Sequence, residues 1–200
     1  YNEINANTYS QSEIDKYKTG NDPDYTSTNW LDEVFRKNAP QTSHSISVRG
    51  GNENVKYYFS GQYVDQSSNF KNSIERYKQF NFRSNIDARI SKNLKVNLDV
   101  AGRQENRTYP FWGVGSILHE TRSKNGFPSN GLAGGRNPVI LVTGLPGYDK
   151  TENYILTPLA GFELKMPFVT EGLSLSGYVS YDVNLKHRKV FNKPWDAYSY

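Results

Sequence analysis

The chain has 200 residues and a formal net charge of +4, because its 24 Lys and Arg are largely offset by 20 Asp and Glu. Aromatic residues make up 14% of the chain, which excludes outright disorder, and the lack of cysteine excludes disulfide scaffolds, Cys-ligated metal sites and thiol nucleophiles. The charges are interspersed and form no basic stripe, so we expect no nucleic-acid partner. No apolar run reaches the roughly 18–20 residues of a membrane-spanning helix.

Residues 1–43 are predicted to be a polar loop with short helical pieces. Ser10 and Glu13 have the spacing of a capping box, in which the serine oxygen accepts from a helix amide and the carboxylate reaches back. Trp30 opens a second apolar group with helical spacing, which stops at Pro40. We expect Trp30 to anchor this loop on a larger body.

From His44 onward apolar residues alternate with polar ones, and this period of two indicates β-strands. Residues 44–103 are predicted to hold four strands in two hairpins with short turns. A loop rich in Gly and Pro follows over 104–153. Residues 154–200 are predicted to hold two further strands and the start of the next loop. A connection as long as 104–153 is unexpected in a compact domain and usually serves a function.

The third and fourth predicted strands have two chemically different faces. One face is apolar and consists of Phe80, Phe82, Ile86, Ile90, Val96 and Leu98. The other is polar and charged and consists of Arg83, Asn85, Asp87, Arg89, Lys95, Asp99 and Arg103. Pairing Ile90 with Leu94 across a tight turn makes the two apolar faces coincide and sets the ring of Phe82 over Gly102.

The lengths of the strands and connections are typical of a transmembrane barrel. The third and fourth strands each have roughly a dozen residues, whereas a strand tilted about 45° crosses a bilayer in about 9–11. Short and long connections alternate, like the periplasmic turns and extracellular loops of outer-membrane barrels, and the charged face suits a watery lumen while the apolar face suits lipid. We therefore predict an all-β fold, in which antiparallel up-and-down strands form a partial segment of a large transmembrane β-barrel with long extracellular loops.

The alternating connections also predict an orientation. With the short turns in the periplasm, the first strand runs downward and residues 1–43 form an extracellular loop. Six strands are too few to close around these polar side chains, since bacterial barrels start at about eight strands. We therefore expect the chain to be a fragment, with an upward strand before Tyr1.

Several motifs occur in an order that resembles one protein family. They are NWLDEVFR at 29–36, AP at 39–40, HSISV at 44–48, GG at 50–51, VKYY at 55–58, Tyr77, FRSNIDA at 82–88 and LKV at 94–96. This series resembles the SusC/RagA-type TonB-linked outer-membrane receptors over residues 10–105. Residues 105–200 match the family only in plan.

The resemblance implies a very large barrel around an N-terminal plug, as in outer-membrane transporters of about 22 strands. It implies a location in the outer membrane of a Gram-negative bacterium, surrounded by membrane lipid. It also implies a SusD-like surface lipoprotein as a lid, the TonB energy-transducing complex acting through the plug, and an oligosaccharide or peptide as the imported substrate. The plug and the TonB box are absent from this sequence.

A cluster of rings in the loop is the candidate ligand or partner contact. It consists of Tyr109, Phe111 and Trp112, with Phe127 further along. Exposed rings stack on sugars or anchor a protein partner. Packing of the loop onto itself would use the same rings, and the sequence leaves both readings open.

The sequence gives little support for a metal, cofactor or catalytic site. His44, His119 and His187 lie far apart, so we expect no metal site and no cofactor. We expect no catalytic residue, because import through a lumen needs no covalent chemistry. The carboxylates of the charged face are expected to pair with bases or to be solvated; they are Asp87, Asp99 and Glu163, with Arg83, Arg89 and Lys95 as the candidate bases.

Two alternatives remain at this point. The first is a soluble all-β carbohydrate-binding or adhesion module, in which the apolar faces of the sheet would meet each other. The second is a glycan hydrolase, which would need two carboxylates converging at about 5–9 Å. Nothing in the sequence demonstrates such a pair.

Overall fold

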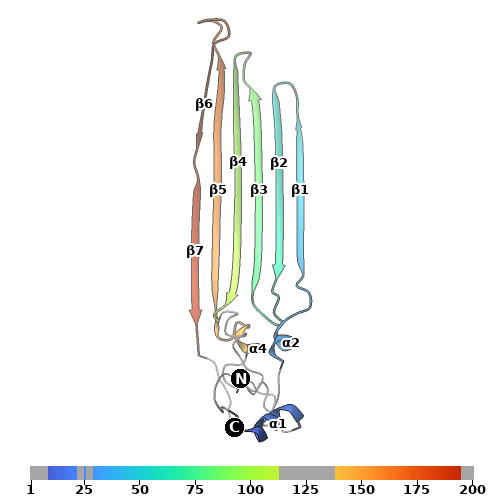
Figure 1. The fold of residues 1–200 in the computed structure, drawn as a ribbon. Helices are drawn as coiled ribbons and strands as arrows, with labels where there is room; N and C mark the ends of the chain where they lie inside the picture. The colour runs from blue at the N-terminus through green and yellow to red at the C-terminus, as the bar shows by residue number, and fades with distance from the viewer. Residues whose placement is uncertain (1–8, 22–24, 26–28, 113–137, 195–200) are drawn as a thin grey trace.

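The computed structural model describes residues 9–21, 25, 29–112 and 138–194. In chain order they form α1 (Gln11–Thr19), α2 (Trp30–Val34), β1 (Gln41–Gly51), β2 (Val55–Ser67), β3 (Arg76–Arg89), β4 (Leu94–Pro110), α4 (Pro138–Leu141), β5 (Gly147–Lys165), β6 (Ser174–Ser180) and β7 (Val183–Asn192) (Figure 1). None of the described helices has the length and apolar character needed to span a membrane.

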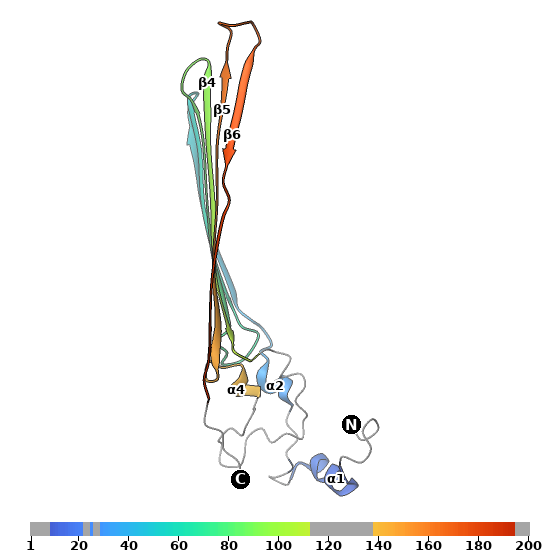
Figure 2. The same ribbon diagram turned by 90° about the vertical axis from the view of Figure 1, so that its left-hand side faces the viewer.

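The seven strands formed by the described residues lie in one antiparallel sheet. Strands β1 to β6 are neighbours in chain order, and β7 also pairs with β5, in line with β6 (Figure 1). Seen from the side, the sheet is a single twisted layer, and no other element of the described residues covers either face (Figure 2). The predicted up-and-down antiparallel order is confirmed, and the sheet does not close on itself within this chain.

The predicted register of the β3–β4 hairpin is confirmed. The backbone N–H of Ile90 donates to the carbonyl of Leu94 at 2.9 Å, and Phe82 is the partner of Gly102. A Cβ added to Gly102 would collide with the ring of Phe82, so this ring covers bare backbone. The glycine is therefore needed to let the aromatic ring lie flat on the neighbouring strand.

The strands extend further than predicted, and the predicted loop 104–153 is wrong at both ends. β4 continues to Pro110 and β5 begins at Gly147, which leaves a connection of 111–146. Past Gly102 the residues of β4 are largely polar on both faces, so hydropathy no longer alternates. The backbone ladder nevertheless continues as far as the pairing of Pro110 with Tyr148.

The final predicted strand is divided into β6 and β7. Tyr181 lies in the break, and its N–H donates to the carbonyl of Pro158 on β5 at 3.1 Å. Proline has no N–H to donate in return, so the ladder is interrupted at this point. β7 then runs to Asn192, and β1 begins at Gln41, inside the predicted loop 1–43.

Helix α1 has the predicted capping box. The backbone N–H of Ser10 donates to the Glu13 carboxylate at 2.7 Å, and the N–H of Glu13 donates to the Ser10 hydroxyl at 3.3 Å. The hydrogen bond from the Ser10 amide, followed by that from its hydroxyl, lowers the pKa of Glu13. Gly20 ends the helix in the left-handed conformation at φ 62°.

Candidate functional site: the two faces of the sheet and its loop end

The register of β3 and β4 divides the predicted site residues between two faces. The residues expected to face a lumen all lie on one side, which we call the polar face: Arg83, Asn85, Asp87, Arg89, Lys95, Asp99 and Arg103. The residues expected to face lipid lie on the other side, which we call the apolar face: Phe80, Phe82, Ile86, Val96 and Leu98, with Ile90 in the turn just beyond β3. Two surfaces of opposite chemistry thus lie back to back on one layer of backbone.

The apolar face continues across every strand of the sheet, and its large side chains are exposed. Ile46 on β1 is 78% exposed, Leu98 on β4 is 44% exposed and Val179 on β6 is 68% exposed. In a soluble sandwich such rows would be covered by a second sheet. A contiguous apolar surface of this kind marks a contact with lipid or with another protein.

The apolar part of this face has a defined height. On β4 it runs from Leu94 to Gly102 and ends at the polar Gln104. The stretch from Leu94 to Gln104 is roughly 34 Å long at about 3.4 Å per residue. A tilt of about 45° reduces this to roughly 24 Å, which matches the apolar band of about 25 Å in outer-membrane barrels.

The polar face is linked by ion pairs and hydrogen bonds between strands. Lys95 Nζ lies 3.2 Å from the Glu163 carboxylate, and the amide of Asn85 donates to Asp99 at 2.6 Å. Asp87 is in no ion pair among the described residues. Of the three carboxylates expected to pair with bases, Glu163 therefore does so, Asp99 binds an amide, and Asp87 faces solvent.

Toward the loop end, the polar face holds a carboxylate with several partners. Glu105 accepts hydrogen bonds from the hydroxyl of Tyr77 at 3.1 Å and from the amide of Asn153 at 3.3 Å. Arg103 Nε lies 3.5 Å from the same carboxylate. These contacts hold a fixed array of polar groups on the polar face.

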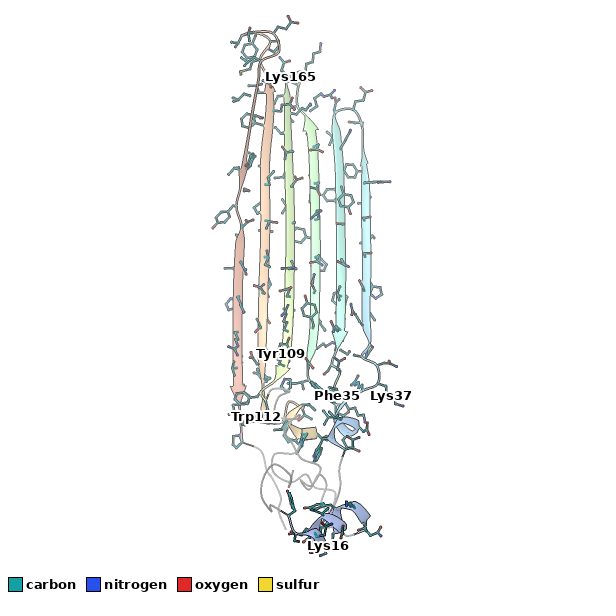
Figure 3. All side chains as sticks on the ribbon, viewed as in Figure 1. Lys16, Phe35, Lys37, Tyr109, Trp112 and Lys165 are labelled. Atoms are coloured by element: carbon teal, nitrogen blue, oxygen red, sulfur yellow. The ribbon has the colours of Figure 1, made fainter. Side chains whose placement is uncertain are left out.

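The predicted ring cluster lies at the loop end of the sheet. Tyr109 is the penultimate residue of β4, belongs to the polar face and is 44% exposed. Phe111 and Trp112 follow it, with ring centroids 5.7 Å apart in an edge-to-face arrangement. Tyr109 and Trp112 lie at the same end of the sheet as Phe35 (Figure 3). Phe127 lies outside the described residues.

A small core at this end joins three segments that are distant in sequence. Val34 of α2, Phe70 of the β2–β3 connection and Val142 after α4 are all buried and in contact. The rings of Phe35 and Phe70 have centroids 4.9 Å apart, and the N–H of Lys71 donates to the carbonyl of Val34 at 2.7 Å. We call this group the loop core.

The loop core was anticipated only in part. Trp30 is 3% exposed, in agreement with its predicted role as an anchor. Phe70 and the run 139–142 were not recognised, because each lies in a segment read as loop. An isolated phenylalanine in a polar stretch and four apolar residues in a Gly-rich loop were the available signals.

In the part of the chain that the structure describes, no group of three or more His, Cys, Asp or Glu is placed to hold a metal ion. His44 lies on β1 and His187 on β7, at opposite edges of the sheet. His119 lies outside the described residues.

Comparison with known sequences finds two similar receptors, while no protein-family model matches the chain. TonB-dependent receptor P3 of Formosa agariphila is 34% identical over 101 residues, which are 50% of this chain and 9% of that receptor. TonB-dependent receptor P26 of the same organism is 35% identical over 118 residues, which are 54% of this chain and 12% of that receptor. The matches thus span only about a tenth of the length of these relatives.

Comparison with solved structures finds the same fold. The RagAB peptide importer in its closed-closed state superposes with a TM-score of 0.66 at 22% identity, covering 87% of this chain and 21% of that one. The open-open state of the importer gives a TM-score of 0.66 at 21% identity, covering 98% of this chain and 24% of that one. At this level of identity the likeness is one of fold.

Proposed function

We propose that this chain, a segment of a SusC/RagA-type TonB-dependent receptor, forms part of the transmembrane wall of an outer-membrane nutrient importer. Two lines of support are independent of each other. The sequence matches proteins named as TonB-dependent receptors, and the sheet exposes an apolar band on one face and charged residues on the other.

The exposed apolar band is the observation that carries the proposal. Its height of roughly 24 Å agrees with what a barrel wall presents to lipid. In this arrangement the apolar face, with Ile86 and Leu98, contacts lipid, and the polar face, with Asn85 and Asp99, lines a hydrated lumen. A soluble binding module is disfavoured, because it would leave this band in contact with water.

We propose a bulky nutrient, an oligopeptide or a glycan, as the imported solute. One structural neighbour is named a peptide importer, and the long β4–β5 connection adjoins the rings of Tyr109, Phe111 and Trp112. These rings would contact the solute or a SusD-like surface lipoprotein at the extracellular mouth. Energy would come from the TonB complex, and passage through the lumen requires no covalent step.

The experiment uses the full-length receptor in its native host. Cells with and without the gene are given labelled oligopeptides and labelled oligosaccharides, and uptake is measured together with the fractionation of the receptor. We expect the receptor in the outer-membrane fraction, copurification of a surface lipoprotein, and loss of uptake of one solute class on deletion. A receptor found in a soluble fraction, or unchanged uptake of both classes, would refute the proposal.

A further inference from the structure

The apolar face changes character toward the loop end of the sheet. Beyond Phe80 on β3 and Tyr154 on β5, the same face carries Arg76, Lys78, Lys150 and Lys189, which we call the outer basic patch. Lys150 is directly opposite Lys189 in the β5–β7 pair, and Thr108 connects Lys150 to Arg76 in the same row. Four basic residues therefore lie on the same face as the apolar band, between the band and the loop end of the sheet.

Two carboxylates, Asp65 and Glu152, lie on the same face beyond the band, so the four bases leave an excess of two positive charges. The guanidinium of Arg76 donates two hydrogen bonds to the carboxylate of Asp65, at 2.8 and 2.6 Å. Within the described residues no carboxylate lies within ion-pair distance of Lys78, Lys150 or Lys189. Like charges directly opposite each other on paired strands destabilise a sheet. An anion bound between Lys150 and Lys189 would remove this repulsion.

The outer basic patch begins at the depth of the lipid headgroup layer. Lys78 is two residues beyond Phe80, and Lys150 is four residues beyond Tyr154. At about 3.4 Å per residue and a tilt of about 45°, these lysines lie roughly 5 and 10 Å past the last apolar row. A bilayer about 40–45 Å thick around a core of about 30 Å has headgroup layers of roughly 5–7.5 Å on each side. Lys78 therefore lies within the headgroup layer, and Lys150 lies a few Å outside it, within reach of a long lysine side chain.

We propose that the outer basic patch binds the phosphate groups of an anionic lipid in the surrounding leaflet, whose acyl chains lie along the apolar band. The inference rests on the proposed function, because it requires the apolar face to meet lipid. Lysine is a common phosphate ligand, and basic residues beside a membrane attract anionic headgroups. A single anionic lipid would thus contact both parts of this face, with its acyl chains on the apolar band and its phosphate on the outer basic patch.

The test uses the full-length receptor, delipidated in detergent, and titrates it with phosphatidic acid or with diacylglycerol of the same acyl chains. Native mass spectrometry counts the bound lipids. The patch variant carries Lys78→Gln, Lys150→Gln and Lys189→Gln. A matched control carries Lys56→Gln, Lys95→Gln and Lys186→Gln, which removes the same charge from the opposite face of the sheet.

Each lysine near an anionic headgroup contributes roughly fivefold to binding, so we expect the patch variant to bind phosphatidic acid about a hundredfold more weakly. The control variant should bind it as the unmodified receptor does, and diacylglycerol binding should be the same in all three proteins. Inorganic phosphate at equal concentration should not displace phosphatidic acid.

Three results would overturn the inference. They are wild-type binding of phosphatidic acid by the patch variant, equal losses in both variants, and displacement of the lipid by inorganic phosphate. Each of these would leave the proposed function standing as long as diacylglycerol still binds. If neither lipid bound the unmodified receptor, the lipid-facing role of the apolar band would fall, and the proposed function with it.

Discussion

Replacing Ile86 with arginine places a charge in the middle of the apolar band. Ile86 is four residues from Ile90 at the short-turn edge, which is roughly 10 Å at about 3.4 Å per residue and a tilt of about 45°. The band is roughly 24 Å high by the same arithmetic, so Ile86 lies near its midplane. The neighbours of Ile86 on the same face are Tyr57 and Leu98, and neither offers a countercharge.

An arginine at the midplane of a barrel wall costs about 2–4 kcal/mol, whereas one near the interface costs about 0–1. We therefore expect Ile86→Arg to destabilise the full-length receptor by about 2–4 kcal/mol, which is a change of about 30- to 700-fold in the folding equilibrium. Phe80→Arg, in the last apolar row, should cost about 0–1 kcal/mol.

Asn85→Arg is the matched control, because it puts the same side chain one residue away on the polar face. There the guanidinium lies opposite Asp99, and we expect a change within about 0.5 kcal/mol. The assay is equilibrium unfolding of the receptor in lipid vesicles by guanidinium chloride, followed by tryptophan fluorescence. Equal destabilisation by Ile86→Arg and Asn85→Arg would refute the division of the sheet into two faces.

Three further predictions address the sheet, the loop core and helix α1. Gly102→Ala should destabilise the sheet by about 1–3 kcal/mol in the same assay, since its Cβ would collide with the Phe82 ring. Gly61→Ala should be tolerated, because its Cβ would meet only Ile46 at 3.8 Å. Equal effects of the two variants would contradict the packing. Phe70→Ala, at a side chain 4% exposed in the loop core, should cost about 3–5 kcal/mol locally. It should open the loop core to limited proteolysis while the strands stay protected, and an unchanged digestion pattern would count against it. The pKa of Glu13 is lower in the folded protein, so its contribution to α1 is present above the unfolded pKa and is lost as the pH falls through the folded pKa. The hydrogen-exchange protection factors of the α1 amides, corrected for the intrinsic pH dependence of exchange, should therefore fall on acidification in the parent and not in Glu13→Gln.

The two faces of the sheet were predictable because a sheet with one apolar face requires a strict period of two. Phe82, Ile86 and Leu98 had to share a face, and this requirement together with the tight turn between Ile90 and Leu94 fixed the register of β3 and β4. The capping box at Ser10 was predictable for a similar reason, because the signal is local and the spacing is fixed.

The parts of the strands at the loop end of the sheet were not predictable in the same way. Past Gly102 both faces of β4 carry largely polar side chains, so the strand is held by backbone hydrogen bonds to β3 and β5 that leave no mark in hydropathy. Phe70 was missed because its partners, Val34 and Val142, are far away in sequence. The division between β6 and β7 depends on Pro158, a residue of the neighbouring strand.

The most direct measurement of the central claim is thiol accessibility at two adjacent positions of β3. Since this chain has no cysteine, the full-length receptor, with any cysteine outside this segment replaced, can carry a single Asn85→Cys or Ile86→Cys in intact outer membranes. We predict that a small water-soluble maleimide labels position 85 and that only a lipid-soluble reagent labels position 86. Labelling of both positions by the water-soluble maleimide would contradict the assignment of the apolar face to lipid.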